Sequence, residues 1–525
     1  MTIPRFSVLF GLTWLTGCVD MGQSPALELS FASFPTSAGC PELLTKSASP
    51  PTLDEIDARL YLPDGSLHFQ KSVAVRDKAA KVSGIPPPPH EGDTLRLEVL
   101  GKQNGQTTWI GGASAIQISV GRSSQVSVLM TAGGRSACIN PMPYPKAFAA
   151  STALSDGKLL LAGGVNQVSS CGDGCKTFIA SKQAALFDPT TGVSTVLTPM
   201  SVARALASAT LLDDGTVLVM GGASRVLQKP GTVLPFTVET ADLAPSYEIY
   251  RPADNTWIDK PLSGGRVFHN AIRLKDGKVL ITGGGQDLGT AMNSALLYDL
   301  TQSGDRLLPL AARLNSPRMG HAAVLLGDGR VLLIGGAPLN GAAVEEYVPA
   351  DQGGGFGIKS IAGASLNLFF HAVAVLPGKP DKIFVAGGAL LPAAQVLAEP
   401  AKDNTRIISK LTESAPESKK AGPLTEARFM ATLAHLGKER LFVGGGFSDL
   451  GKTPSAALEQ WDLLAETFSV PIDPDGNAVR CTDPRAGSVA SAFVGDRLLF
   501  LGGLDADKIR ASGEVYTPKI EEITP

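Results

Sequence analysis

The stretch that decides the fold runs from Arg318-Met-Gly-His321 to Asp328-Gly-Arg-Val-Leu-Leu-Ile-Gly335-Gly336. It joins a basic residue, an Asp-Gly turn and an apolar run that ends in two glycines. Just beyond it, Val344-Glu345-Glu-Tyr347 offers a short strand with an aromatic residue. Short apolar runs separated by turn residues are typical of antiparallel strands. The stretch therefore predicts a hairpin followed by at least one more strand.

An apolar run ending in Gly-Gly occurs seven times along the chain. The first glycines are Gly163, Gly221, Gly283, Gly335, Gly387, Gly445 and Gly502, at spacings of 58, 62, 52, 52, 58 and 57 residues. Units of this kind cannot bury both faces alone, so they stack as the blades of a propeller. The sequence predicts an all-β propeller of seven four-stranded blades, with six blades and one degenerate unit as the alternative.

A basic residue stands seventeen positions before the first glycine in six units. These residues are Lys146, Arg204, Arg266, Arg318, Arg428 and Arg485, and the fifth unit has Leu368. We expect them to form a ring near one mouth of the central channel, where they could attract an anionic ligand or an acidic glycan. Alternatively, each could bond to backbone carbonyls or to an acid of a neighbouring blade.

A strand after each Gly-Gly carries an aromatic residue, which we expect to fill the gap between blades. These residues are Phe187, Tyr250, Tyr298, Tyr347, Trp461 and Tyr516, and the fifth unit offers Leu397. The glycines are expected to allow positive φ or close backbone approach near the axis. Leu424 to Gly437 has helical propensity, but the repeat register from Arg428 to Gly445 predicts a strand there.

These motifs resemble the kelch repeat, and the Asp-Gly version before Gly-Gly is similar to its bacterial, galactose-oxidase-type branch. The resemblance covers residues 139–525 and implies a propeller, but little about function, because such propellers serve as enzymes, adaptors and glycan binders. Galactose oxidase needs two histidines, two tyrosines and a cysteine crosslinked to one tyrosine. Here His269 and His371 follow Phe268 and Phe370. The resemblance to that enzyme therefore stops at the scaffold.

Histidines occupy one repeat position in three consecutive units, at His269, His321 and His371. Imidazole is a good ligand for copper or zinc. Kelch units commonly carry histidine here as a repeat feature, however, and equivalent positions on neighbouring blades need not converge. We predict no metal and no cofactor.

The N-terminus has the features of a lipoprotein signal. A basic residue precedes an apolar run from Phe6 to Gly17, too short to cross a bilayer, and Leu15-Thr16-Gly17-Cys18 resembles the bacterial lipobox. Residues 1–17 are interpreted as a signal peptide and 18–23 as a linker lipidated at Cys18. An ordinary signal peptide is the alternative. We expect an exported protein anchored by lipid in the bacterial cell envelope, the outer membrane being favoured over the inner.

Residues 24–135 do not follow the repeat. Runs such as Leu27-Glu-Leu-Ser-Phe31 and Leu95-Arg-Leu-Glu-Val99 alternate apolar and polar residues, as half-buried strands do. About seven such runs predict a small antiparallel, immunoglobulin-like β-sandwich. It would separate the propeller from the membrane, and no site is predicted in it.

Composition and charge exclude several classes of function. The formal net charge is −3 and the pI about 6.1, so a nucleic-acid partner is not expected. Six cysteines in 525 residues are too few for a disulfide framework. The short spacing of Cys171 and Cys175 predicts one disulfide. No nucleophile elbow, zinc-protease motif or phosphate-binding loop is present.

Two features remain to be considered, the segment that closes the last blade and the long loops after Gly-Gly. The last blade could be closed by the segment around Cys138 or by residues 519–524. The loops after Gly-Gly are long in units one and two, Val165 to Lys182 and Ala223 to Pro245, and should form one surface on the same face. Phe178, Arg225 and Phe236 are its expected anchors.

The sequence therefore predicts a non-enzymatic module that binds a protein or glycan of the cell envelope. Shortening both long loops is expected to abolish this binding while changing the melting temperature by only a few degrees. A carbohydrate oxidase and a purely structural envelope protein are the alternatives.

Overall fold

The computed structural model of the chain contains strands and short 3-10 turns but no α-helix among the residues that it describes. These residues are 25–33, 51–90, 92–118, 122–231 and 236–518, the last range with short gaps after residues 286, 338, 361, 376, 390, 400, 411, 413, 436, 449, 481, 493 and 505. The expected signal peptide, Cys18 and Leu397 lie outside them. No helix in the described part is long and apolar enough to cross a membrane.

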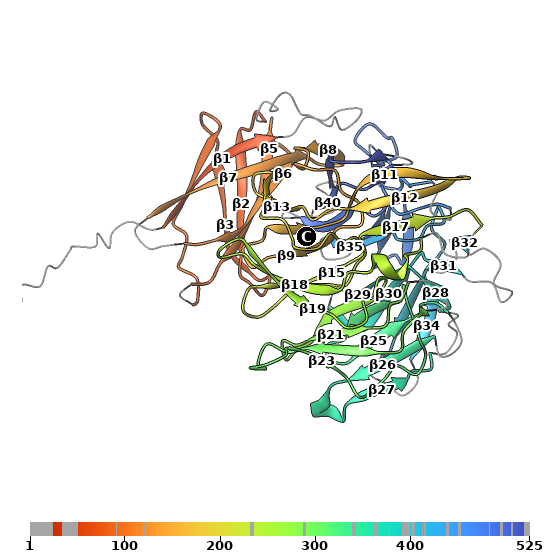
Figure 1. Cartoon of the computed structure of the whole chain (residues 1–525). Helices are drawn as coiled ribbons and strands as arrows, with labels where there is room; N and C mark the ends of the chain where they lie inside the picture. Colours follow the sequence, from red (N-terminus) through yellow and green to blue (C-terminus); the bar gives the residue numbers. More distant parts are fainter. Residues whose placement is uncertain are drawn as a thin grey trace, which may run out of the picture.

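The N-terminal domain is one seven-stranded sheet of order β3-β2-β5-β6-β7-β1-β4 (Figure 1). Its strands are β1 Ala26–Ser33, β2 Glu55–Tyr61, β3 Leu67–Ala74, β4 Ala79–Ser83, β5 Leu95–Gln103, β6 Gln106–Ile116 and β7 Ser123–Ala132. The expected alternation is present, since Leu27, Leu29 and Phe31 of β1 face one core. One pairing differs from a purely antiparallel domain, because β1 runs parallel to β7.

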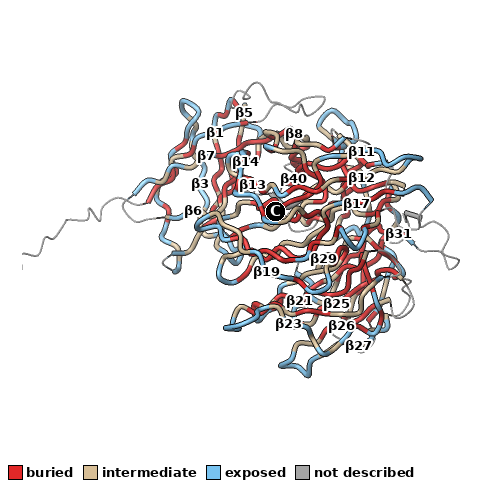
Figure 2. The backbone as a smooth tube through the Cα atoms, in the orientation of Figure 1, coloured by how far each residue is buried: buried red, intermediate tan, exposed pale blue. Residues whose placement is uncertain are grey.

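Seven four-stranded antiparallel sheets form the blades of the propeller. Blade one contains β9 Ala150–Ala153, β10 Leu159–Ala162, β13 Ala184–Asp188 and β14 Val193–Val196. Blade two contains β15 Ser208–Leu211, β16 Val217–Met220, β18 Ser246–Arg251 and β19 Thr256–Pro261. Blade three contains β20 Asn270–Arg273, β21 Val279–Thr282, β22 Ala295–Tyr298 and β23 Leu307–Pro309. Blade four contains β24 Ala322–Leu325, β25 Val331–Ile334, β26 Val344–Val348 and β27 Gly355–Ile358. The second strand of each of these blades is buried throughout, as apolar runs ending in Gly-Gly require (Figure 2).

Blades five and six repeat this plan, and blade seven is completed from the N-terminal side. Blade five contains β29 Ala372–Leu376, β30 Lys379–Ala386, β33 Arg406–Ser409 and β34 Glu417–Lys420. Blade six contains β35 Thr432–Leu436, β36 Arg440–Gly444, β37 Leu458–Asp462 and β38 Thr467–Ser469. Blade seven contains β39 Val489–Phe493, β40 Arg497–Leu501, β43 Gly513–Thr517 and β8 Arg135–Ile139. Because β8 pairs with β43, the segment around Cys138 closes the ring of seven blades. The strand expected after Arg428 is β35.

Smaller sheets decorate the blade connections. They comprise β11 Val165–Gly172, β12 Cys175–Ala180 and β17 Arg225–Gln228; β28 Leu368–Phe369, β31 Ala389–Leu390 and β32 Glu399–Pro400; β41 Leu504–Asp505 and β42 Lys508–Ile509. Single 3-10 turns cover Thr240–Asp242 and Ala350–Gln352. We call the face with the connections after Gly-Gly the loop face, and the opposite face, with the Asp-Gly turns, the turn face.

The Gly-Gly pair joins each blade to the next. In blade four, Gly335 has a φ of +63°, and a Cβ there would lie 2.1 Å from the carbonyl oxygen of Leu368 in blade five. The next residue, Gly336, donates its N–H to that same carbonyl at 2.7 Å. The contact recurs around the ring and closes it where Gly503 of blade seven bonds to Lys146 of blade one at 2.7 Å. Both expected roles of the glycines, positive φ and close approach, are confirmed.

Aromatic residues fill the seams between blades, as expected. Trp461 of blade six lies 4.7 Å from Phe384 of blade five, and Tyr516 of blade seven lies 5.5 Å from Phe442 of blade six, measured between ring centroids. Blade five differs from the sequence expectation, because its third strand is β33. In this strand Ile408, which pairs with Ile383, occupies the position that an aromatic residue holds in the other blades. Leu397 is therefore not the equivalent residue. A long connection before β33 hid the true register.

The two domains are joined rigidly. β7 continues into β8 through Gly133 and Gly134, so the expected boundary at residues 135–139 moves to these glycines. At the junction, Arg497 of blade seven is fully buried and donates to the carbonyl of Leu129 at 3.0 Å and to the Thr131 hydroxyl at 3.2 Å. Burial lowers the pKa of Arg497 to about 9. The N-terminal domain is thus packed against the propeller and does not hang from a free linker.

Candidate functional site

The six repeated basic residues are structural and do not form an exposed ring. Each is at most 3% exposed. Arg204 donates to the carbonyl of Gly221 at 2.8 Å, and Arg485 donates to that of Gly502 at 2.7 Å, so each binds the first glycine of its own blade. Lys146 does the same with Gly163 at 2.9 Å, and its burial lowers its pKa to about 8. The ligand role at the channel mouth is wrong because these cations are buried, and the alternative, bonding to backbone carbonyls, is confirmed.

Buried acids pair with several of these arginines. Arg204 lies 2.8 Å from Glu248 and Arg428 2.5 Å from Glu459, all four side chains being fully buried. Each glutamate also accepts backbone N–H groups of the loop before the arginine, such as Ser201 at 2.7 Å from Glu248. Buried pairs satisfied in this way hold the loop in one conformation, whereas removing one partner leaves an uncompensated charge.

A cavity of about 340 Å³ lies on the propeller axis, lined by residues from all seven blades. Its wall includes one residue of every unit, two positions after the basic residue or, in unit five, after Leu368: Phe148, Leu206, Phe268, Gly320, Phe370, Met430 and Gly487. All seven have φ between +52° and +62°. Five hydrogen bonds link this residue to its counterpart in a neighbouring blade, among them the one from the Phe370 N–H to the Gly320 carbonyl at 2.7 Å. They help to hold the backbone in this conformation.

The three histidines line this cavity and remain neutral. The Nε2 atom of His269 is hydrogen-bonded with the Ser208 hydroxyl at 2.8 Å, and that of His321 with the Thr282 hydroxyl at 2.9 Å. Neither ring nitrogen of His371 has a partner among the described residues. Burial lowers the pKa of His269 to about 3 and of His371 to about 4, and holds that of His321 well below its usual value.

The residues of the cavity do not fit the copper site that the fold resemblance implies. Phe268 and Phe370 precede His269 and His371, so neither histidine has a tyrosine beside it in the chain, and no cysteine lines the described wall. Two of the three histidines use Nε2 for hydroxyl groups of the protein. Among the described residues, no three histidine, cysteine or carboxylate side chains lie close enough to hold a metal ion. The cavity offers apolar contact and neutral hydrogen-bonding groups.

The two long loops of blades one and two form one sheet, as expected. β12 pairs with β11 of its own loop and with β17 of the neighbouring loop. A disulfide between Cys171 and Cys175 closes the β11–β12 hairpin, which confirms that prediction. Cys138 is also disulfide-bonded, with a partner outside the described residues, and Cys481 is a buried free thiol. We call the surface of β11, β12 and β17 the cross-blade sheet.

The expected aromatic anchors face inward from the cross-blade sheet. Phe178 and Phe236 are 0% and 1% exposed and belong to the apolar cluster that fills the axis at the loop face. The Phe236 ring lies 5.3 Å from that of Phe148 and 5.5 Å from that of Phe447 in blade six, measured between centroids. Their assignment as binding anchors is wrong. These loops complete the core, so the expectation that they can be shortened without loss of stability does not hold either.

Strand alternation decides which residues of the cross-blade sheet face solvent. Val168, Phe178 and Val226 lie opposite one another across the three strands and point inward. The rows on either side consist of Gln167, Ile179 and Arg225, and of Ser169, Thr177 and Leu227. Of these, Gln167, Ser169 and Arg225 are exposed, Ile179 and Thr177 are half-buried, and Leu227 is buried. The period of two along Thr177-Phe178-Ile179-Ala180 was the signal that could have identified the outward residues.

Arg225 is the expected anchor that the structure leaves accessible. Its side chain is 48% exposed, and its Nε donates to Asp242 at 2.8 Å. The Asp242 carboxylate is 7% exposed and also accepts from the Ser224 hydroxyl at 3.2 Å. The hydrogen bond from Arg225 to Asp242 raises the pKa of Arg225. A guanidinium held in place on one side is pre-organised for a planar acceptor on the other.

Comparison with known proteins supports the fold only. No protein-family model matches the chain, and no curated protein matches its sequence. Among solved structures, a fungal alcohol oxidase of the AA5 family in complex with copper is similar, with a TM-score of 0.55 and 15% identity over 75% of this chain and 79% of the other. The chain thus has a galactose-oxidase-like β-propeller fold. At this identity the likeness carries no activity.

Proposed function

We propose that the protein is a non-enzymatic binding propeller of the bacterial cell envelope, and that the cross-blade sheet recognises a protein or carbohydrate partner. The observation that carries the proposal is the fusion of two loops from adjacent blades into one disulfide-closed sheet. Its exposed side chains include the polar Gln167 and Ser169 and the held guanidinium of Arg225. Binding surfaces on repeat scaffolds are commonly built from such uneven loops on one face.

The axial cavity supports the non-enzymatic part of the proposal. Its described wall has neither a carboxylate, a thiol nor a tyrosine, and its histidines are neutral at any physiological pH. A general acid or base works best with a pKa near the working pH, which none of these histidines has. The cavity therefore lacks the groups that acid–base or nucleophilic catalysis requires.

Attachment to the membrane is part of the same proposal. A lipid on Cys18 would hold the protein at the envelope, with the outer membrane favoured, and residues 24–132 would separate the propeller from the lipid. The hydrogen bonds of Arg497 across the junction support a fixed orientation of the propeller with respect to the N-terminal domain.

The alternative is an oxidase acting on alcohols or sugars in the axial cavity. The similarity to the AA5 alcohol oxidase and the presence of three histidines in the wall of the cavity favour it. Peroxide release from a panel of sugars and alcohols, with copper added, would establish this alternative and refute the binding proposal. A purely structural envelope role would be indicated by a protein that captures no partner.

A pull-down from envelope extract tests the proposal with two matched arginines. The bait lacks residues 1–23 and carries either Arg225→Ala or, as control, Arg251→Ala, whose side chain on blade two is 46% exposed. We expect the control to capture the partner like the wild type and Arg225→Ala to lose about tenfold in affinity, as loss of a central interface arginine does. Equal capture by both variants would place the site elsewhere.

A further inference from the structure

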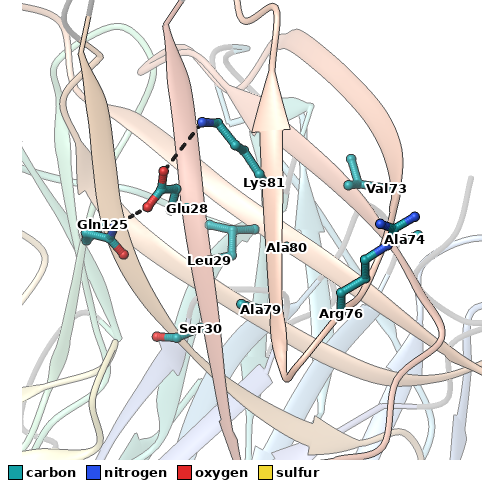
Figure 3. A pocket seen from close by; sticks show the side chains of 10 residues that line it. All are labelled: Glu28, Leu29, Ser30, Val73, Ala74, Arg76, Ala79, Ala80, Lys81 and Gln125. Atoms are coloured by element: carbon teal, nitrogen blue, oxygen red, sulfur yellow. Dashed lines mark hydrogen bonds and ion pairs between the residues drawn. The ribbon is translucent and has the colours of Figure 1, made fainter.

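A hollow of about 530 Å³ lies at the open edge of the N-terminal sheet, far in the chain from the propeller loops. It is bordered by β4 and β1 on one side and by the end of β3 on the other (Figure 3). β3 and β4 are the two outermost strands of the seven-stranded sheet. The sheet therefore curls until its edges face each other without pairing.

A tight turn connects these edges, yet the strands diverge from it. Arg76 and Ala79 exchange two backbone hydrogen bonds of 2.9 Å, with Asp77 and Lys78 at φ of +50° and +62° between them. This geometry normally starts a hairpin. Beyond the turn, however, β3 pairs only with β2 and β4 only with β1. At the far end the opening is bridged by a side chain, as Lys71 Nζ donates to the Ser83 carbonyl at 2.8 Å.

Backbone groups point into this opening from both sides. Peptide groups alternate in direction along an antiparallel strand. Since Ala79 directs its N–H and C=O across the turn, Lys81 directs its own into the opening. By the same alternation Ala74 and Ser72 of β3 face it. None of these three residues has a backbone partner across the opening among the described residues. Two unpaired edges that face each other can bond a further strand between them.

The chemistry around the opening favours an acidic occupant. Of the charged side chains, Arg76, Lys81 and Glu28 line the hollow. Lys71 bridges its far end, and Asp77 and Lys78 form the turn that closes its near end. Glu28 is already engaged by Lys81 at 3.6 Å, and Gln125 also donates to it. The exposed Arg76 guanidinium forms no ion pair with the described residues. Leu29, Val73 and Ala80 supply apolar contact in the same hollow.

We infer that the opening between β3 and β4 binds an extended, acidic segment of another protein by strand addition. The backbone of the segment would pair with Lys81 and Ala74. Its alternate acidic side chains would meet Arg76 and Lys78, and its small apolar side chains would contact Val73 and Ala80. This second interaction surface is independent of the cross-blade sheet and gives the N-terminal domain a binding role of its own.

Fluorescence anisotropy with a labelled peptide tests this inference on the full chain. The probe is an acetylated Glu-Val-Glu-Val-Glu-Val, compared with its Lys-Val counterpart and with a version N-methylated at every second residue. We expect binding of the acidic peptide alone, weakened by salt. N-methylation should weaken it about tenfold or more, because it removes backbone donors worth about 1 kcal/mol each.

Protein variants locate the binding. Arg76→Glu should weaken the acidic peptide about tenfold, while Lys260→Glu, an equally exposed change on blade two, should leave it unchanged. Hydrogen exchange of the wild type should show new protection confined to residues 70–83. This second measurement does not depend on the folding of any variant.

Several results would overturn the inference. They are no binding by the full chain, equal binding of the lysine peptide, or equal binding by Arg76→Glu. The unliganded protein could also dimerise, and Arg76→Glu could abolish that dimer. This result would show that the opening binds a second copy of the chain instead. Protection of the Ser72, Ala74 and Lys81 amides already present without peptide would assign the opening to the protein's own chain.

Discussion

Replacing Phe236 with alanine tests whether the loops over the axis belong to the core. The ring is 1% exposed and lies between Phe148, Phe178 and Phe447, at centroid distances of 5.3, 6.1 and 5.5 Å. Truncating a buried phenylalanine costs about 3–5 kcal/mol. Residues of a surface loop would cost less than about 0.5 kcal/mol.

The expected change in melting temperature follows from the size of the unfolding unit. The propeller spans residues 135–517. At roughly 2 cal/mol/K per residue, its unfolding entropy is about 0.8 kcal/mol/K. A loss of 4 kcal/mol therefore lowers the melting temperature by about 5 °C. Differential scanning calorimetry measures this shift directly.

The control is Leu464→Ala, which removes a comparable apolar group from a side chain that is 71% exposed. We expect no resolvable shift for it. A Phe236→Ala protein that melts within 1 °C of the wild type would show that the loop does not plug the axis. Such a result would also remove the reason for rejecting Phe236 as a partner contact.

Three further predictions concern acid stability, the blade contacts and the anchor. In the folded protein the pKa values of His269 and His371 are about 3 and about 4, below the usual 6.5. As the pH falls from about 6.5 toward 4, these histidines therefore bind protons in the unfolded chain but not in the folded protein. The free energy of unfolding decreases over this range. His371→Leu should flatten this decline in melting temperature, and an unchanged decline would contradict the assignment. Gly335→Ala should cost about 3–5 kcal/mol in urea unfolding because its Cβ meets the next blade. Gly215→Ala, whose Cβ would face open space, should cost about 1 kcal/mol, and equal costs would refute the close approach. Cys18→Ala should abolish labelling by radioactive fatty acid, and persistent labelling would exclude that residue as the lipid site.

The repeat allowed much of the fold to be predicted from sequence. Gly335 and Gly336 recur in register because neighbouring atoms occupy the space of their side chains, the Leu368 carbonyl of the next blade at Gly335 and Arg318 and His321 of the same blade at Gly336. Such a steric demand leaves a signal in every copy. Tyr516 and Trp461 are similarly fixed by the seams that they fill. Local rules therefore sufficed for blades, turns and seams.

The errors arose where contacts across the sequence decide the outcome. Phe178 resembles an anchor by residue type, but its burial depends on which side of β12 meets the axis. The basic residue Arg485 resembles a channel ligand until the carbonyl of Gly502 is placed beside it. Blade closure by β8 and the shift from Leu397 to Ile408 depend on pairings separated by long connections. The periodicity of a single segment contains no information about pairings between strands that are distant in the sequence.

Site-specific photocrosslinking tests the central claim, that the loop face binds through the cross-blade sheet. A photoreactive residue at Ser169, on an outward row, is compared with one at Asp276, in an Asp-Gly turn of the opposite face. We predict a crosslinked partner from Ser169 that disappears in the Arg225→Ala background, and none from Asp276. Crosslinking from Asp276 with none from Ser169 would contradict the account.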